Sequence, residues 1–469
     1  MTNEEICFKP ALELARLVRE KALSPVEITH AFLDRIEALD PRLNAYLTVA
    51  GDYAREAARR AEQALATGNP LGPLHGVPFS IKDLVFTAGI RTTGGSRVYE
   101  DFVPDYDSIV VKRLKEAGGI LLGKTSTPEF GHKGTTENLI IGDTHNPWAL
   151  DKTPGGSSGG AGAATAAGMS PLSIGTDAGG SIRIPASFNG VFGFKPTFGR
   201  IPDFPGFGGG RTLAHTGPMT RTVAAAALML DVIAHPAEAA RSSLPDHETT
   251  YLASIGAIPD SLRVGFSPDL GYAPVEAEIA DIVRRAVNAF DDIGWTVEKS
   301  HPGFDDPHEI FNTVIRAENY AVARPLLERH ADLLDPGMRA FTENGATVTA
   351  RDYLLAQVER DRIAGTLADY FDRYDVLVTP TLAVPPFEIH SRPQQIAGRD
   401  IHGLSWLAFT YPFNLTGNPA ASVPCGFTRD GLPVGMQVVG PRHADALVLK
   451  VCAAFEQARP WIDHRPGMT

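Results

Sequence analysis

Two serines lie in separate glycine-rich segments and could act together in one catalytic site. Ser157 belongs to the segment 155–159, and Ser181, 24 residues further along, follows two glycines and the apolar run 171–174. A strand that ends in glycines lets backbone N–H groups converge on one point, because no side chain obstructs the approach. Donors arranged in this way stabilise the negative oxygen that develops when a serine attacks a carbonyl carbon.

Each segment also has a purely structural explanation. Residues 155–159 match the pattern G-x-S-x-G of a nucleophile elbow, but that elbow needs a hydrophobic strand before the serine, and residues 151–154 read as a loop. The first segment is then a glycine-serine loop at a helix N-terminus, which attracts negative charge, or a flexible turn into a close-packed helix. The second segment could be a tight turn, and we expect an ion pair between Asp177 and Arg183 to fix its shape.

A third glycine pattern, Gly118-x-x-x-x-Gly123-Lys124-Thr125, matches the phosphate-binding P-loop letter for letter. A P-loop needs a strand before it and a helix that begins at the lysine, so that backbone N–H groups face the phosphates. Here a helical stretch, 110–117, comes first, and the apolar run 120–122 lies inside the motif. A helix, a glycine cap and a buried strand are the preferred interpretation, and a nucleotide-binding protein is the alternative from another functional class.

The elements around these motifs predict an α/β fold. From 76 to 220, short β-branched runs alternate with helices. The chain up to about 75 and from about 235 to 375 reads as mostly helical, with one strand expected at 262–266. A capping box at 24–27 begins the first long helix. Because no repeat and no low-complexity linker is present, we expect one contiguous domain over residues 1–469 with 76–220 as its catalytic core.

Together the two serine segments, from Gly155 to Pro196, resemble the stretch that defines the amidase signature family. The separation of the serines agrees with that family, and residues 76–83 are similar to the segment that carries its catalytic lysine. Further matches, which spread over most of the chain, are 146–148, 374–380, 414–420 and 431–435. The resemblance implies a single domain with a mixed, largely central β-sheet covered by helices on both sides.

The resemblance also implies a role for each polar residue. Ser181 is expected to be the nucleophile, Lys82 the base, and Ser157, on a cis peptide bond, the serine that relays the proton between them. A lysine can act as a base near neutral pH only if burial lowers its pKa from about 10.4 to about 7 to 8. Ser158, like the Asp177–Arg183 pair, is expected to support the site. The N–H groups expected to bind the oxyanion are those of Ala178, Gly179, Gly180 and Ser181. This chemistry requires no metal and no organic cofactor.

The resemblance leaves several classes of substrate open. The family includes simple, aryl-acyl and carbamate-cleaving amidases, lactam and nylon-oligomer hydrolases, and the A subunit of glutamyl-tRNA amidotransferase, in which an acidic residue helps to hold glutamine. Here that position is Leu407, among aromatic residues. A pocket lined by such groups would prefer hydrophobic or aryl amides, or the aromatic side chains pack a core. The pocket candidates are Phe130, Trp406, Phe409 and Phe413.

We therefore expect an amidase that forms an acyl-enzyme on Ser181, with esters or carbamates as side substrates. The alternatives within the family are the lactam or nylon-oligomer hydrolases and the amidotransferase subunit. The helical region 235–375 is expected to shape one wall of the pocket.

The composition indicates which binding partners and which cellular compartment to expect. The formal net charge is −12, whereas nucleic acids and anionic membranes are bound by basic surfaces, so neither is expected as a partner. The three cysteines are far apart and lack a metal-binding spacing, which fits a reducing cytoplasm. No signal peptide or membrane-length apolar run is recognisable. The expected partner is a small amide substrate. A homodimer fits a family of this kind, although no motif demonstrates one.

Overall fold

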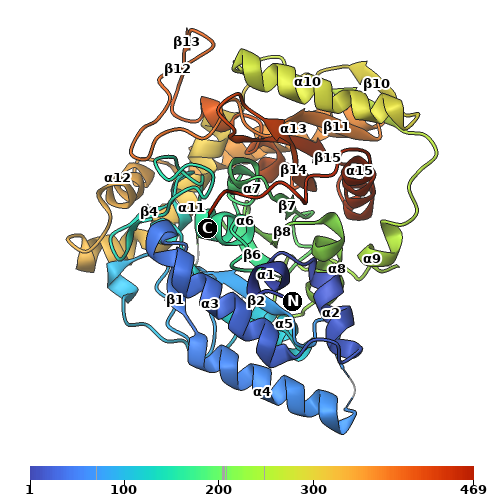
Figure 1. Ribbon diagram of the computed structural model, residues 1–469. Helices are drawn as coiled ribbons and strands as arrows, with labels where there is room; N and C mark the ends of the chain where they lie inside the picture. Colours follow the sequence, from blue (N-terminus) through green and yellow to red (C-terminus); the bar gives the residue numbers. More distant parts are fainter. Residues whose placement is uncertain (70, 203–205, 208, 248, 469) are drawn as a thin grey trace.

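The computed structural model describes residues 1–69, 71–202, 206–207, 209–247 and 249–468, and a mixed β-sheet runs through its centre (Figure 1). The strands of this sheet are β1 Tyr46–Val49, β2 Pro78–Lys82, β3 Ile120–Thr125, β6 Leu172–Asp177, β7 Phe192–Lys195, β8 His215–Thr220, β9 Arg263–Phe266, β10 Thr296–Lys299, β11 Val376–Pro380, β14 Ala420–Phe427 and β15 Pro433–Val439. Their spatial order is β1-β3-β2-β6-β8-β7-β14-β15-β11-β9-β10. Two small two-stranded ribbons lie outside it: β4 Glu137–Asn138 with β5 Gly142–Asp143, and β12 Gln395–Ile396 with β13 Arg399–Asp400.

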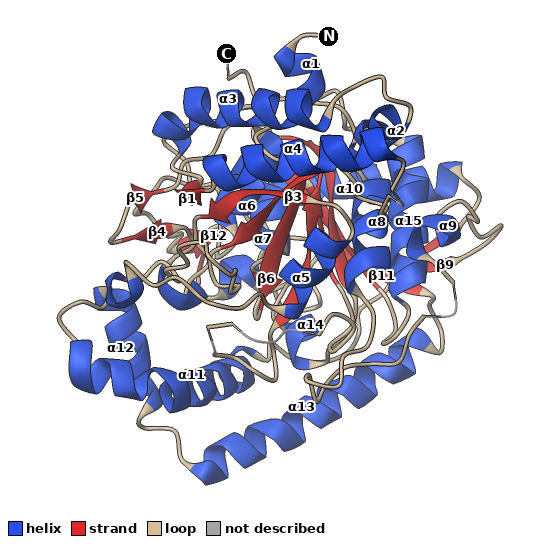
Figure 2. Ribbon diagram, turned by 90° about the horizontal axis from the view of Figure 1, so that it is seen from below, coloured by secondary structure: helices blue, strands red, loops and turns tan. Residues whose placement is uncertain are grey.

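Helices cover both faces of the sheet. On one face lie α6 Gly159–Ala166 and α7 Arg183–Asn189, and on the other lie α8 Val223–Ile233, α10 Ala277–Asp292 and α15 Asp445–Ala458 (Figure 2). The shorter or more peripheral helices are α1 Asn3–Cys7, α2 Ala11–Arg19, α3 Pro25–Leu43, α4 Gly51–Thr67, α5 Ile109–Glu116, α9 Tyr251–Ser254, α14 Pro412–Leu415 and the 3-10 turns η1 Arg97–Tyr99, η2 Glu129–Gly131 and η3 Ser405–Leu407. In the described part of the chain, no helix is both long and apolar enough to cross a membrane.

Three helices form a separate group away from α3 and α4 (Figure 2). They are α11 His308–His330, α12 Pro336–Gly345 and α13 Ala350–Phe371, and α11 packs against the other two. They belong to the region 235–375 that the sequence predicts to be mostly helical. Side chains of α11 and α12 line a cavity that is described below.

The strand order places the predicted lysine beside the predicted nucleophile segment. Strands β2, β3 and β6 are parallel neighbours, with Ser80 opposite Ser173 and Ile81 opposite Ile174. Their carboxyl ends therefore meet at one edge of the sheet. That edge is where open α/β sheets bind their ligands.

The predicted α/β domain, with a mixed sheet between two layers of helices, is confirmed. The capping box at Ser24 is also present, at the start of α3. The helical interpretation of the two outer regions was incomplete, because β1 and β10 lie within them. Both are four-residue strands at the sheet edges. β10 is largely exposed, and β1, although Tyr46 and Leu47 are buried, is too short for its pattern to stand out between two helices.

Candidate active site

Lys82 is the last residue of β2, and its side chain is fully buried. Its Nζ donates a hydrogen bond of 2.7 Å to Ser157 Oγ and another of 2.9 Å to Thr176 Oγ1, with Thr176 O at 3.4 Å. Thr176 lies near the end of β6, the parallel neighbour of β2. The amine is therefore held between the loop that carries Ser157 and the strand that leads to Ser181.

The first serine segment is a loop that ends at the N-terminus of α6. The peptide bond between Gly156 and Ser157 is cis, as the resemblance implied. Ser158 N–H donates to Ser181 O at 3.1 Å, which joins the backbones of the two serine segments directly. Ser158 Oγ also donates to Thr176 O and accepts from Thr176 N–H, both at 3.2 Å. Ser158 therefore supports the site, as predicted, by fastening the loop to β6.

The second serine segment connects β6 to α7. Among the described residues, the N–H groups of Ala178, Gly179 and Ser181 have no protein acceptor. Gly180 is different, because its N–H donates to Asp177 Oδ1 at 2.6 Å. The prediction that Gly180 also binds the oxyanion is corrected accordingly: its N–H is used to shape the loop, and three of the four predicted donors remain.

Glycine is required in this loop for two reasons. Gly180 has a φ of +131°, and a β-carbon at this position would lie 2.4 Å from Thr410 Oγ1. A β-carbon on Gly179 would lie 2.6 Å from the ring of Phe311 on α11. Side chains at either position would push the loop out of the place it shares with these neighbours.

The predicted ion pair between Asp177 and Arg183 is present. Arg183 Nε lies 3.0 Å from Asp177 Oδ2, and both side chains are fully buried. Burial by itself would raise the pKa of Asp177, but the charge and the hydrogen bonds of Arg183 hold that pKa well below its ordinary value. The carboxylate is therefore ionised, and it also accepts from the N–H of Ile182 at 3.2 Å.

Residues far along the chain complete this pair, and the sequence analysis assigned them no role. Arg183 donates to Thr410 O at 2.9 Å, to Gln437 Oε1 at 2.8 Å and to Asn414 Oδ1 at 2.6 Å. Asn414 in turn donates to Asp177 Oδ1 at 2.8 Å. Asn414 begins the segment 414–420, which carries the family resemblance, and that match was the available indication. Thr176 and Gln437 lie in strands and had no such indication.

Comparisons with known proteins agree with this geometry. The Amidase family model matches residues 27–449. The chain belongs to the amidase signature family. It is 40% identical over 472 residues to an acylamidase of Rhodococcus erythropolis, in an alignment that covers 100% of this chain and 99% of the relative. It is 38% identical over 490 residues to the A subunit of the glutamyl-tRNA(Gln) amidotransferase of Moorella thermoacetica, with 99% of both chains covered.

A solved structure of the same family has a closely similar fold. A bacterial aryl acylamidase of the amidase signature family superimposes with a TM-score of 0.92 at 33% sequence identity, covering 98% of this chain and 99% of that one. The resemblance to the amidase signature family and to acyl and aryl amidases is therefore confirmed.

In this amidase, the P-loop pattern is part of the sheet. Lys124 lies in β3 and is fully buried. Its Nζ donates to Val85 O, to Thr87 Oγ1 at 2.9 Å and to Thr92 Oγ1 at 3.0 Å. Three oxygen acceptors match the three N–H donors of a lysine, so Lys124 has no donor left for a phosphate. The nucleotide-binding alternative is rejected.

A cavity of 580 Å³ lies at the edge of the sheet where β2 and β6 end, and Ser157 and Ser181 both line it. Its wall includes Phe130, as predicted, together with Phe86 and Phe207, which the sequence analysis did not single out. The region 235–375, which was expected to shape one wall, contributes the lining residues Ala239, Ala240, Arg241 and Ser242.

The other three aromatic residues proposed for the pocket lie in the core instead. Trp406, Phe409 and Phe413 are 4%, 0% and 0% exposed and belong to a buried hydrophobic cluster. The ring of Trp406 packs 5.1 Å from that of Phe387 and 6.1 Å from that of Phe188, measured between centroids. Their contribution to the site is indirect: Phe409 O accepts a hydrogen bond from Gln437, which holds Arg183.

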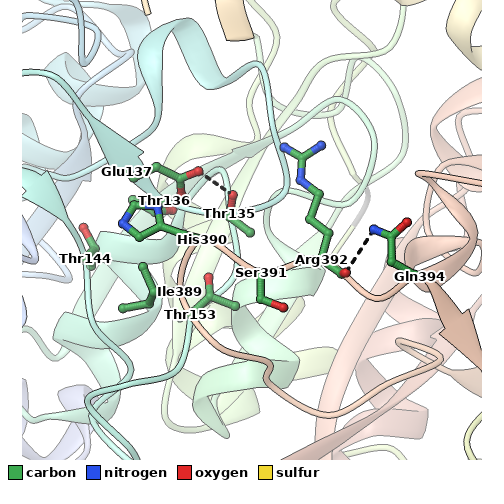
Figure 3. A pocket seen from close by; sticks show the side chains of 10 residues that line it. All are labelled: Thr135, Thr136, Glu137, Thr144, Thr153, Ile389, His390, Ser391, Arg392 and Gln394. Carbon is green, nitrogen blue, oxygen red and sulfur yellow. Dashed lines mark hydrogen bonds between the residues drawn. The ribbon is translucent and has the colours of Figure 1, made fainter. Parts of the chain in front are cut away.

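A separate polar cavity of 380 Å³ lies behind the Ser157 loop (Figure 3). Two of its threonines hold the loop: Thr136 Oγ1 donates to Gly155 O at 2.8 Å, and Thr153 Oγ1 accepts from Gly155 N–H at 3.1 Å. Neither Ser157 nor Ser181 is among its described lining residues, which are Thr135, Thr136, Glu137, Thr144, Thr153, Ile389, His390, Ser391, Arg392 and Gln394. The threonines in the wall of this cavity therefore support the Ser157 loop.

Among the described residues, one group of side chains has donors of the kind that bind metals: Asp306, His308 and His402. His402 Nδ1 accepts from the N–H of Leu404, so the proton of a neutral ring is on Nε2, which lies 3.0 Å from Asp306 Oδ2. The two histidine rings stack at 3.9 Å with 19° between their planes, so their in-plane lone pairs do not converge. The arrangement suits a hydrogen-bonded cluster better than a metal centre.

Proposed function

We propose that the chain is a stand-alone cytoplasmic amidase that hydrolyses hydrophobic or aryl amides through an acyl-enzyme on Ser181. The observation that carries the proposal is the hydrogen bond of 2.7 Å from Lys82 to Ser157, in a cavity whose wall also includes Ser181. A serine hydroxyl is a weak nucleophile until a base takes its proton. Lys82 is fully buried, and removal from water disfavours a charged ammonium group, so an uncharged amine can serve as that base.

The first half of the reaction forms the acyl-enzyme. The hydroxyl proton of Ser181 passes to Ser157, whose own proton passes to Lys82, while Ser181 Oγ bonds to the amide carbonyl carbon. The carbonyl oxygen becomes an oxyanion, and the N–H groups of Ala178, Gly179 and Ser181 are the donors available to it. The C–N bond then breaks as the proton returns through Ser157 to the leaving nitrogen. The products of this half are an amine and an ester on Ser181.

The second half uses the same groups. A water molecule gives its proton to the relay and attacks the ester carbonyl, and the collapse of this intermediate returns the proton to Ser181 Oγ. The products are a carboxylic acid and the original enzyme. Because esters and carbamates also present a carbonyl carbon that Ser181 can attack, we propose them as side substrates of this relay.

The preference for apolar substrates rests on the cavity wall and on the relatives. Phe86, Phe130 and Phe207 line the cavity, and the similar proteins include an acylamidase and an aryl acylamidase. At the position where the resemblance placed an acidic residue that holds glutamine, Leu407 is 6% exposed within a hydrophobic cluster. This observation favours a stand-alone amidase, without a nucleic-acid partner, over an amidotransferase subunit.

A substrate panel tests the proposal on the purified chain without any partner protein. We expect hydrolysis of acetanilide and hexanamide in preference to glutamine, a cyclic lactam or a phenyl carbamate, and no hydrolysis by the control Ser181→Ala. Ammonia release from glutamine as the fastest reaction would favour the amidotransferase subunit instead. A preference for the lactam would favour the lactam or nylon-oligomer hydrolases. Turnover that persists in Ser181→Ala would refute the assigned nucleophile.

A further inference from the structure

We propose that Glu129 is a positioning residue for Ser157, which acts by fixing the turn 129–131 against the hydroxyl of that serine. This inference rests on the proposed function and deepens it, because it adds a residue that takes no part in the proton relay but holds the relay in place. It is carried by the contact between the turn and Ser157, by the bonds of the buried Glu129 carboxylate, and by the loop that joins this carboxylate to the neighbour of Lys82.

The turn lies directly beside the proposed relay serine. A β-carbon on Gly131 would lie 3.1 Å from Ser157 Oγ, so the hydroxyl lies against a position that has no side chain. Gly131 and Ser157 both line the catalytic cavity. Ser157 Oγ also accepts the hydrogen bond of 2.7 Å from Lys82. A shift of this turn would therefore change the space in which that hydroxyl receives and passes on a proton.

The carboxylate of Glu129 connects the turn to two other parts of the chain. Glu129 is 1% exposed, and its two oxygens have different donors: Ser96 Oγ at 2.5 Å and the N–H of Asp335 at 2.7 Å. Asp335 is the N-cap of α12. A fully bonded polar network in the protein interior is rigid, so the carboxylate restricts the movement of the turn relative to both partners.

The backbone of the turn depends on such support. Phe130 has a φ of +49° and Gly131 has a φ of +74°, and this left-handed region is rare for a phenylalanine. A residue keeps such a conformation only where its surroundings enforce it. The N–H of Phe130 donates to Gly94 O at 2.8 Å, and the carboxylate bonds of Glu129 hold the residue before it.

A short loop links the turn to the strand that carries the base. Asp83 follows Lys82 and is fully buried, and its Oδ2 accepts from Thr93 N–H at 2.8 Å and from Thr93 Oγ1 at 2.6 Å. Three residues further along this loop, Ser96 donates to Glu129. Groups beside both members of the proposed relay are therefore joined through one loop, which fixes their separation.

The bond to Asp335 also joins the turn to the helices that border the oxyanion loop. Phe130, Met338 of α12 and side chains of α11 line one cavity of 460 Å³, so the turn and these helices are not in contact over their whole length. Helix α12 packs against α11, whose Phe311 lies beside Gly179. The carboxylate of Glu129 thus holds the Ser157 side of the site in register with the helical group.

The hydrogen bonds of Glu129, rather than its charge, are what a glutamine can reproduce. Burial raises the pKa of Glu129 to about 7, although the bonds from Ser96 and Asp335 act in the opposite direction. The nearby charges of Asp335 and Lys133 have opposite signs, and Lys133 Nζ lies 3.8 Å from Asp335 Oδ2. A glutamine of the same shape can accept from the N–H of Asp335 and donate to Ser96 Oγ, so it should keep the turn in place.

An amide and an ester with the same acyl group and the same ring test this role. They are 4-nitroacetanilide and 4-nitrophenyl acetate. In Glu129→Ala, kcat for the amide should fall about 100-fold, because a displaced Ser157 returns the proton to the leaving nitrogen poorly. The loss of kcat for the ester should be only about fivefold, since 4-nitrophenolate leaves without that proton. Glu129→Gln should recover most of both losses.

A double-mutant cycle tests whether Glu129 acts through Ser157. Ser157→Ala removes the hydroxyl, so the addition of Glu129→Ala should lower kcat for the ester by less than about twofold further. The matched control is Glu456→Ala, because burial also raises the pKa of this carboxyl to about 7 and it accepts from Val223 N–H at 3.2 Å, where α15 meets α8. This control should lose stability and keep kcat within about twofold of wild type.

Each other outcome contradicts the role of Glu129. No loss in Glu129→Ala, equal losses for the amide and the ester, a full further loss in the Ser157→Ala background, a glutamine variant as slow as the alanine variant, or an equal loss in Glu456→Ala would overturn it. If Glu129→Ala does not fold, Ser96→Ala removes one of the two bonds and should lower kcat for the amide about 10-fold, and an unchanged kcat there would overturn the inference. Failure of the folded wild type on both substrates would refute the proposed function itself, which is a distinguishable result.

Discussion

Lys82 and Lys124 are fully buried lysines on neighbouring parallel strands, yet their hydrogen-bond partners differ. In the register of β2 and β3, Lys124 lies opposite Ile81, one residue from Lys82. Lys124 donates to one carbonyl and two threonine hydroxyls inside the protein. Lys82 donates to Ser157, a hydroxyl that itself lines the catalytic cavity.

The comparison shows that burial alone does not make a lysine a catalytic base. Burial lowers the pKa of Lys124 to about 8, although the nearby charge of Asp83 acts in the opposite direction. Neither of the two threonine hydroxyls that Lys124 contacts lines the cavity. Lys82 differs in that it donates to Ser157, a hydroxyl that lines the cavity and that we propose as the proton relay.

The largest expected effect separates the two lysines by activity. Lys82→Met removes the proposed base while keeping an unbranched side chain of similar length, so amide turnover should fall about 10³- to 10⁶-fold. Stability should not decrease greatly, since no buried charge is created. The measurement is the rate of anilide hydrolysis beside the melting temperature of the same sample. A variant that keeps more than a tenth of the wild-type rate would contradict the role of Lys82.

Arg183 is a third buried cation, and it differs from both lysines because it forms an ion pair with a carboxylate. Asp177→Asn leaves its guanidinium without that charge, which should lower the free energy of unfolding by about 3 to 5 kcal/mol. Turnover should also fall, because Asp177 shapes the oxyanion loop through Gly180. Urea denaturation measures the first effect. As a control, Asp281→Asn removes an exposed ion pair with Arg284 and should change the stability by less than about 1 kcal/mol.

Lys124→Met is the counterpart of the first variant, with the roles reversed. It leaves buried acceptors at Val85 and at two threonines without their donor, so the free energy of unfolding should fall by about 1 to 3 kcal/mol. The kcat of the folded protein should stay within about twofold of wild type. A large loss of kcat in a stable variant would show that Lys124 takes part in the reaction and would end the contrast between the two lysines.

The smallest expected effect is on the pH dependence of stability. Because the folded chain releases the Lys124 proton near pH 8 and the unfolded chain near its ordinary value of 10.5, the unfolded state binds more protons between these values. The stability of the wild type should therefore rise with pH across this window relative to Lys124→Met, and the two should run parallel below it. Denaturant midpoints at several pH values measure the difference. Parallel curves throughout would contradict the lowered pKa.

Patterns within short stretches of sequence predicted the structure better than patterns that join distant parts of the chain. The capping box at Ser24 and the spacing between Ser157 and Ser181 are local, and the structure contains both the helix and a single cavity that the two serines share. Gly180 could have been read differently, since an aspartate three residues before a backbone N–H often accepts from it in a turn. The sequence pattern indicates Asp177 as a partner for Arg183 and gives no separate sign of its bond to Gly180.

The aromatic residues show where sequence reasoning reached its limit. Phe130 lines the cavity and Trp406 packs a core, yet both are large apolar side chains in loop-like segments. Only the path of the chain decides which of them meets solvent-accessible space. Phe207 could not be selected for the same reason, because its neighbours Phe86 and Tyr99 come from a distant part of the sequence.

The hydrogen bonds of Arg183 have a consequence for biosynthesis. Its acceptors Asn414 and Gln437 lie 231 and 254 positions later in the chain. A ribosome therefore completes Lys82, Ser157 and Ser181 long before it makes the groups that hold the loop between them in place. A fragment ending before α14 would contain every proposed reacting side chain but lack both acceptors, and we expect it to be inert, so the activity should arise only when translation has nearly finished.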